Sequence, residues 1–322
     1  MDQPKRNSNV PCSWRAAGAR QVEADTLHEL GALSMFDDRP DVSDHNWAEE
    51  LRICREIGDR QGEGRALRDL GLLQRTRGQY AKAIACFEES LPVCQQTGHR
   101  RDEGWAQHCL GLVYGELGDY ASARTYAERA AAIHRATDDH LGMDWVCWIL
   151  ARACAQEGDY AGAREWLAQM PEGQYEAMRT WFLADVSLAQ GDAERAKCEY
   201  EETLRLAPAA STEWPERAAL CGLAEIALAD GDLAQAQRYT AELLTDLEEH
   251  PWPGVFLSFR PHLVCYRVLR ASGDPRADEI LEQAYYMLQE RAAQIEEEAL
   301  RRSYLENVAV NREIVAEYAR RH

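Results

Sequence analysis

Two stretches, "GELGDYASAR" at 115–124 and "AQEGDYAGAR" at 155–164, write the same Gly-Asp-Tyr-Ala-x-Ala-Arg pattern forty residues apart. Related turns recur along the chain. The glycines that open them are spaced by 40, 40, 33 and 40 residues, and they are Gly78, Gly118, Gly158, Gly191 and Gly231. Self-similarity at a nearly fixed period indicates a repeat architecture. The sequence therefore predicts an array in which similar units stack on their neighbours.

Each Gly-Asp turn separates two helical patterns. The stretch 101–117 has apolar residues at helical spacing, and Gly118 is predicted to end this helix because glycine tolerates the left-handed conformation that follows a last turn. Asp119 is predicted to cap the next helix by accepting hydrogen bonds from its free N–H groups. The second helix then presents a stripe of small residues at which two antiparallel helices can approach closely, namely Ala123, Ala127 and Ala130.

These units resemble the tetratricopeptide repeat (TPR) family. The resemblance rests on "LGLVY" at 110–114 followed by Ala123, and on "LGLLQ" at 70–74 followed by Ala83 and Phe87. It implies an all-α, right-handed superhelical solenoid of about seven antiparallel helix pairs. The forty-residue step exceeds the usual repeat of about 34 residues, which implies longer helices, as in kinesin-light-chain-like repeats.

The resemblance places the repeat array at 19–293. Residues 1–18 are polar and are expected to form a flexible leader, and 294–322 depart from the repeat and are expected to form a C-terminal helical cap. Within this tail, "RRSYLENVAVNREIV" at 301–315 is similar to the segment that closes repeat arrays in bacterial signalling ATPases and transcriptional regulators. That similarity implies the partner-binding sensor of such a system. No GxxxxGK[ST] nucleotide loop is present in the sequence.

The composition limits the kinds of partner that the protein is expected to bind. The chain has 322 residues, with 36 Lys+Arg against 55 Asp+Glu and a formal net charge of −19, which disfavours direct contact with nucleic acid. No apolar run approaches the roughly 20 residues of a membrane span, and the first residues lack the apolar core of a signal peptide. Ten cysteines are scattered without a CxxC pair. This usage favours a reducing compartment and predicts a cytoplasmic protein.

Candidate catalytic groups are few. His134, Asp138, Asp139 and His140 lie close together in "HRATDDH" (134–140), but they lack a histidine pair at helical i, i+4 spacing. We interpret this segment as a solvated loop between units and not as a metal site. No Cys/His spacing indicates a catalytic nucleophile. The sequence therefore predicts a non-enzymatic protein without metal or cofactor.

In TPR arrays the first helix of each pair lines the concave wall, and the resemblance assigns this sequence's groove positions. The predicted groove residues are Arg65, Arg68, Trp105, His108, Trp145, Trp148, Arg152 and Trp181. Exposed Trp and Arg dominate binding hot spots, and arginine can grip a carboxylate with two parallel bonds. An extended or helical peptide with apolar side chains and an acidic group would suit such a wall. Alternatively, the same tryptophans pack between neighbouring helices of a tight superhelix, and the sequence leaves both alternatives open.

The predicted function is binding of a protein or peptide in the concave groove, in signalling or transcriptional regulation. The chaperone-tail carboxylate clamp of the TPR family is not supported, because its Lys and Asn positions hold His28, Ala32, Arg68 and Leu72. The alternative is a scaffold that self-associates through its convex face or its C-terminal helix. The apolar residues of that helix are Tyr304, Leu305, Val308, Ile314, Val315 and Tyr318.

Overall fold

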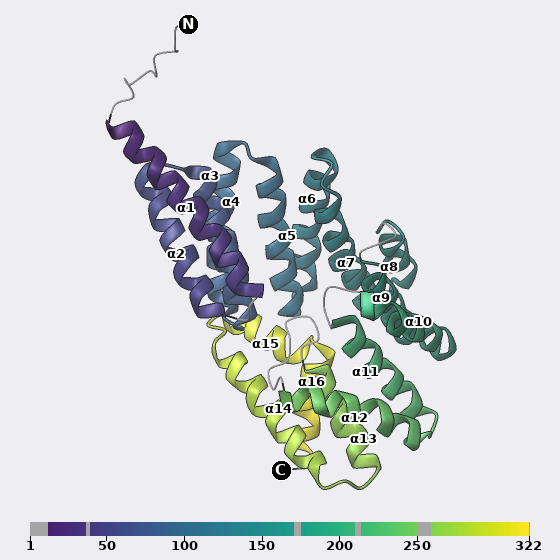
Figure 1. Cartoon of the computed structure of the whole chain (residues 1–322). Coiled ribbons are helices and arrows are strands. Elements are labelled where there is room, and N and C mark those ends of the chain that lie inside the picture. Colours follow the sequence, from purple (N-terminus) through teal and green to yellow (C-terminus); the bar gives the residue numbers. More distant parts are fainter. Residues whose placement is uncertain (1–11, 37–38, 171–174, 210–213, 250–258, 322) are drawn as a thin grey trace, which may run out of the picture.

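A computed structural model describes the chain except residues 1–11, 37–38, 171–174, 210–213, 250–258 and 322 (Figure 1). The described residues form sixteen α-helices and one short 3-10 helix at Ala207–Ala209, without any strand. The first eight helices are α1 (Cys12–Phe36), α2 (Pro40–Ile57), α3 (Arg60–Thr76), α4 (Tyr80–Thr97), α5 (Arg100–Glu116), α6 (Tyr120–Ala136), α7 (His140–Gln156) and α8 (Tyr160–Leu167). The others are α9 (Glu176–Ala189), α10 (Ala193–Leu206), α11 (Trp214–Ala229), α12 (Leu233–Glu249), α13 (Arg260–Ala271), α14 (Arg276–Ala293), α15 (Glu298–Glu306) and α16 (Ala309–Ala319).

The recurring Gly-Asp turns have the conformation that the sequence predicts. Gly118 and Gly158 adopt φ values of 77° and 81°, and the glycines of the other repeat turns are also left-handed. Asp119 accepts a hydrogen bond from the backbone N–H of Ser122 at 3.1 Å, and Asp159 accepts one from Gly162 at 2.9 Å. The same short motif therefore ends one helix and begins the next.

Consecutive helices pack as antiparallel pairs, and the pairs stack into a solenoid, which confirms the predicted all-α TPR-like architecture. Successive first helices contact one another from α1 through α13, whereas from α2 to α14 no comparable contact joins successive second helices in the described part of the chain. The first helices therefore lie on the shorter, inner side of the curve, and the second helices lie on the outer side.

The first pair begins earlier than the sequence indicates. Helix α1 starts at Cys12, so residues 12–18 of the predicted leader are helical, whereas 1–11 lie outside the described residues. Helix α2 starts at Pro40, and proline at the first helical position is favourable because no N–H bond is lost there.

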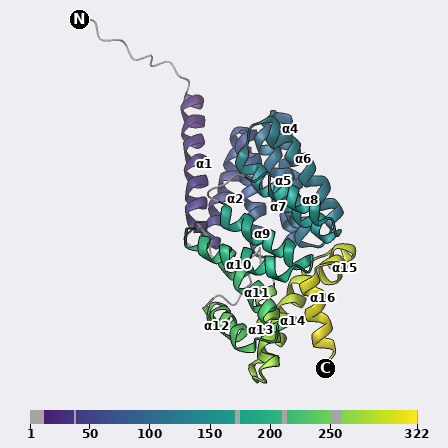
Figure 2. The same cartoon turned by 90° about the vertical axis from the view of Figure 1, so that its right-hand side faces the viewer.

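The C-terminal segment, predicted as a cap, forms two short helices instead of one. Helix α16 packs on α13 and α14, and Tyr266 donates a hydrogen bond to Glu317 at 2.9 Å. In Figures 1 and 2 the C-terminal helices lie beside the turn ends of the second and third pairs. One buried apolar cluster joins these regions, and its members include Tyr80, Phe87, Leu110, Leu117, Leu263, Leu288, Tyr304 and Ile314. The cap therefore closes the solenoid against its own N-terminal half.

The described residues show how the cysteines are placed and how apolar the helices are. Seven of the nine cysteines whose side chains are described are buried free thiols, so they act as small apolar residues. In the same part of the chain, no helix combines the length and apolarity that crossing a bilayer requires.

Candidate partner-binding site

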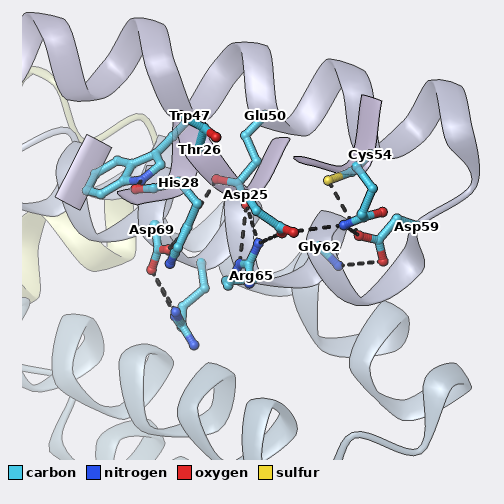
Figure 3. Close-up of polar contacts among 12 residues, drawn as sticks. Asp25, Thr26, His28, Trp47, Glu50, Cys54, Asp59, Gly62, Arg65 and Asp69 are labelled. Atoms are coloured by element: carbon cyan, nitrogen blue, oxygen red, sulfur yellow. Dashed lines mark hydrogen bonds and ion pairs between the residues drawn. The ribbon is translucent and has the colours of Figure 1, made fainter. Parts of the chain in front are cut away.

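The inner wall begins with a polar network between the first two pairs (Figure 3). The guanidinium of Arg65 donates from Nε and Nη2 to Glu50, at 3.2 and 3.0 Å, and its Nη2 also contacts Asp25 at 3.3 Å. Although burial disfavours the charge on Arg65, the Glu50 carboxylate raises its pKa. His28 Nδ1 lies 3.3 Å from Glu50 and 3.4 Å from Asp69.

The second predicted arginine of this wall, Arg68, is also neutralised within the chain. Its Nη2 lies 2.9 Å from Asp69, and its Nη1 lies 3.6 Å from Asp102. The sequence predicts that Arg65 and Arg68 are available to an acidic group of a ligand. In the structure, carboxylates of α1, α2, α3 and α5 already occupy both guanidinium groups, so this part of the expectation does not describe the molecule.

The predicted tryptophans come together as a row of aromatic rings along α5, α7 and α9. The Trp105 ring lies 5.3 Å from His108, and His108 lies 6.3 Å from Trp145. The Trp145 ring lies 6.5 Å from Trp148, and Trp148 stacks on Phe182 at 5.3 Å. The Trp181 ring lies 4.5 Å from Phe182; all of these are distances between ring centroids. The rings therefore contact one another across three successive repeats. We call this set the aromatic row; its members are Trp105, His108, Trp145, Trp148, Trp181 and Phe182.

The members of the row differ in exposure, which resolves the two alternatives residue by residue. Trp148, Trp181 and His108 are 4%, 3% and 4% exposed, so they are packed between helices. Burial, followed by the charge of His134, lowers the pKa of His108 to about 3, which leaves the imidazole neutral. Trp105 and Trp145 are partly exposed. Only these two rings of the predicted set offer surface to a ligand.

Arg152 lies on α7, one helical turn after Trp148. Its guanidinium lies 4.9 Å from the centre of the Trp148 ring, and its Nη2 lies so close to Gly115 that a Cβ there would approach it to 2.2 Å. The nearby Glu116 is buried and accepts a bond from Arg75 at 2.5 Å. Arg152 thus extends the wall toward the turn between α5 and α6.

The second half of the wall carries a partly buried ionic hub, whose residues are not among those predicted for the site from the sequence. Arg260 donates to Asp185 and Glu225 at 2.7 Å each, and its Nη2 lies 3.2 Å from the Tyr200 hydroxyl. Tyr200 in turn donates to Asp185 at 2.5 Å. The signal was present in the sequence, because Asp185, Glu225 and Arg260 occupy inner positions of their repeats. The hub ties α9, α10, α11 and α13 together.

The segment at 134–140 is only partly the solvated loop that the sequence analysis expected. Asp138 and His140 are exposed, but His134 is fully buried and Asp139 is 5% exposed. Asp139 caps α7 and accepts bonds from Arg101 at 3.1 Å and from the Trp105 indole at 2.9 Å. The prediction of a solvated loop is wrong for His134 and Asp139, because both side chains pack between the third and fourth helix pairs. Among the described residues, no group of three or more His, Cys, Asp or Glu is arranged to hold a metal ion.

Comparisons with known proteins agree with this architecture. Residues 22–96 and 102–169 match the family model "Tetratricopeptide repeat". No curated protein sequence matches the chain. Among solved structures, the Rap conjugation gene regulator of plasmid pLS20 in complex with the Phr* peptide has a TM-score of 0.64 and 11% identity over 92% of this chain and 83% of its own. NprR in complex with its cognate peptide NprX has a TM-score of 0.63 and 12% identity over 93% and 87%.

A third similar structure is the Pyrococcus horikoshii STAND protein (Signal Transduction ATPase with Numerous Domains) PH0952, with a tetratricopeptide repeat sensor. Its TM-score is 0.58 at 14% identity, over 97% of this chain and 51% of that one, so this chain spans about half its length. At these identities the similarity shows the fold alone. The family match identifies tetratricopeptide repeats at 22–96 and 102–169, and the stacked helix pairs continue the same architecture: the chain has a tetratricopeptide repeat fold.

Proposed function

We propose that this protein is a non-enzymatic module that binds a peptide or a protein segment along the inner wall of its first helices. The observation that carries the proposal is the aromatic row, which runs without interruption across α5, α7 and α9. Partly exposed tryptophan rings backed by buried ones give a rigid apolar surface, and tryptophan is enriched in binding hot spots.

The proposed setting is regulatory. The solved structures of similar fold include two regulators in complex with peptides and one signalling ATPase with a TPR sensor. We extend that setting to this chain as part of the proposal, in the cytoplasm and without direct contact with nucleic acid or membrane. The ligand would signal by binding the array, and the chain would pass the signal to a partner protein.

The alternative of a self-associating scaffold has less support in the structure. The apolar residues of the tail, which the sequence analysis assigned to self-association, contribute to the chain's own core. Tyr304 and Ile314 are buried, and Leu305, Val308, Val315 and Tyr318 pack against the same cluster. The tail therefore caps and closes the array, and the groove remains the favoured site.

The test uses Trp145→Leu as the groove variant and Trp166→Leu as the matched control. Both rings are partly exposed, but Trp166 lies on α8, on the outer side of the curve. Heptapeptides selected from a random display library with the wild-type protein would be measured by fluorescence anisotropy. We expect Trp145→Leu to weaken binding at least about tenfold and Trp166→Leu to leave it unchanged. Equal effects of the two variants, or no selectable peptide, would overturn the proposal.

A further inference from the structure

A pocket of about 380 Å³ lies between α4, α5 and α6, at the joint between the second and third helix pairs. The polar residues that line it are Gln95, Arg100, Glu103, Gln107 and Arg129. They come from the last turn of α4, the first half of α5 and the second half of α6. None of them belongs to the aromatic row, so the pocket is separate from the proposed groove.

Gln107 is a buried polar residue at a position where the neighbouring repeats have apolar ones. At the forty-residue spacing its equivalents are Leu67 and Cys147, which are 2% and 1% exposed, and Gln107 itself is 4% exposed. The side-chain oxygen of Gln107 is buried and accepts no hydrogen bond from the described residues. Because a buried carbonyl oxygen without a donor is costly, an N–H group of a ligand would stabilise this side of the pocket.

The joints before and after the pocket are bridged by side chains at equivalent positions. Between the first and second pairs, Arg55 on α2 donates to Glu63 at 3.0 Å and also to Glu89 on α4. Between the third and fourth pairs, Arg135 on α6 donates to Gln169, just after α8, at 3.3 Å. At both joints the bridge therefore links the outer sides of consecutive pairs.

The joint at the pocket lacks this bridge because both of its members differ. Gln95 replaces the bridging arginine, and Arg129 replaces the acceptor. Gln95 and Arg100 both donate to Glu103. Arg129 has neither a hydrogen bond nor an ion pair with the described residues, and its guanidinium lies 5.7 Å from the centre of the Tyr126 ring. The pocket thus has two arginines and one glutamate, a positive charge on a chain whose net charge is −19.

We propose that this pocket binds the side-chain carboxylate of a glutamate or aspartate in a protein or peptide segment. The carboxylate takes the place that Glu89 has in the preceding joint, with Arg129 and Arg100 as donors, and a backbone N–H group of the segment binds Gln107. A carboxylate fits better than a phosphate, because the pocket has a single excess positive charge and the preceding repeat uses a carboxylate there. The pocket is a second site, and it does not depend on the groove function.

The first test is a titration with N-acetylglutamate N-methylamide, which has one carboxylate and two backbone N–H groups. Binding would be followed by the NMR signals of the Gln107 side-chain amide, which are identified by their absence in Gln107→Leu. We expect saturable shifts with a dissociation constant in the millimolar range, and none with the neutral glutamine analogue. Arg129→Gln should weaken binding at least about tenfold. The control Arg124→Gln, on the same helix but paired with Glu157, should leave binding unchanged.

Three results of this titration would overturn the proposal. One is the absence of saturable shifts in the wild type up to about 50 mM probe. Another is an equal effect of the two arginine variants. The third concerns the source of the carboxylate: glutarate is a free dicarboxylate without an N–H group, and binding of glutarate as tight as that of the probe would contradict a protein segment as the ligand.

A second test copies the preceding joint into this one with the double variant Gln95→Arg/Arg129→Glu. The substituted side chains should form the bridge within the chain. We therefore expect the variant to be at least as stable as the wild type in urea and to lose binding of the probe. A variant that is less stable, or that binds the probe as the wild type does, would contradict the proposal. Trp145→Leu should leave binding of the probe unchanged, so the pocket and the groove are tested separately.

Discussion

The side-chain amide of Asn307 donates a hydrogen bond at 3.2 Å to the backbone carbonyl of Gly118, 189 residues earlier in the chain. This bond joins the short C-terminal helix pair to a repeat turn in the N-terminal half. The Tyr80 and Tyr304 rings, with centroids 5.9 Å apart, form a second contact between the same regions. The solenoid is therefore closed on itself, and its curvature is fixed by contacts within the chain.

The closing contact predicts that two identical turns tolerate mutation differently. Gly118 and Gly158 open the same Gly-Asp-Tyr motif with φ near 80°, but a Cβ on Gly118 would lie 2.8 Å from the Ser303 carbonyl, whereas nothing lies within 4 Å of one on Gly158. We expect Gly158→Ala to lower the free energy of unfolding by about 1 kcal/mol, the cost of a left-handed alanine. We expect Gly118→Ala to cost about 1–3 kcal/mol more, because backbone must shift as well.

Chemical denaturation would give both free energies, and hydrogen exchange over 298–319 would report on the closing pair. Faster exchange there is expected for Gly118→Ala alone. If both variants lost the same stability, and exchange in the C-terminal helices did not change, the closure would have no energetic role.

The exposure of the aromatic row predicts which tryptophans can serve as binding probes. Trp148 is 4% exposed and stacks on Phe182, so Trp148→Ala should lower the free energy of unfolding by about 3–5 kcal/mol. The partly exposed Trp145 should cost about half as much or less when changed to leucine, because a leucine still covers the neighbouring rings. Equilibrium unfolding monitored by circular dichroism tests the difference, and equal losses would contradict the assigned burial.

Much of the fold could be predicted because its determinants are local. A left-handed glycine, a capping aspartate and a stripe of small residues recur in sequence order, and each acts within one or two turns of helix. The closure could not be predicted, because it depends on how the small rotation of each repeat accumulates along the array. Nothing in the sequence near Gly118 or Asn307 indicates that the two residues meet.

The candidate site was predictable as a set of positions but not as an environment. Repeat alignment places Trp105, Trp145 and Trp148 on one wall, and the structure brings their rings together. Alignment does not state which ring is covered, since that depends on the tilt of each neighbouring helix. Nor does it pair the charges: the carboxylates that occupy Arg65 come from two other helices, α1 and α2.

The buried carboxylate of Asp144, which has no hydrogen bond or ion pair among the described residues, predicts a pH-dependent stability. Burial raises the pKa of Asp144 to about 6 from a usual value of 3.8, with His140 acting weakly in the opposite direction. Because the folded pKa exceeds the unfolded one, the folded chain holds this proton more tightly. The contribution of Asp144 to stability is therefore fully present below about pH 3.8 and is lost as the pH rises through 6.

Asp144→Asn, which cannot ionise, should then be more stable than the wild type by about 1–3 kcal/mol at pH 7.5, and the gain should shrink toward zero near pH 4. Urea denaturation at several pH values would measure it, with Asp69→Asn as the control. Loss of the Asp69 charge leaves Arg68 without its closest carboxylate, so that variant should be less stable than the wild type at pH 7.5. A destabilised Asp144→Asn would contradict this prediction and would show that the carboxylate has a stabilising partner in the folded chain.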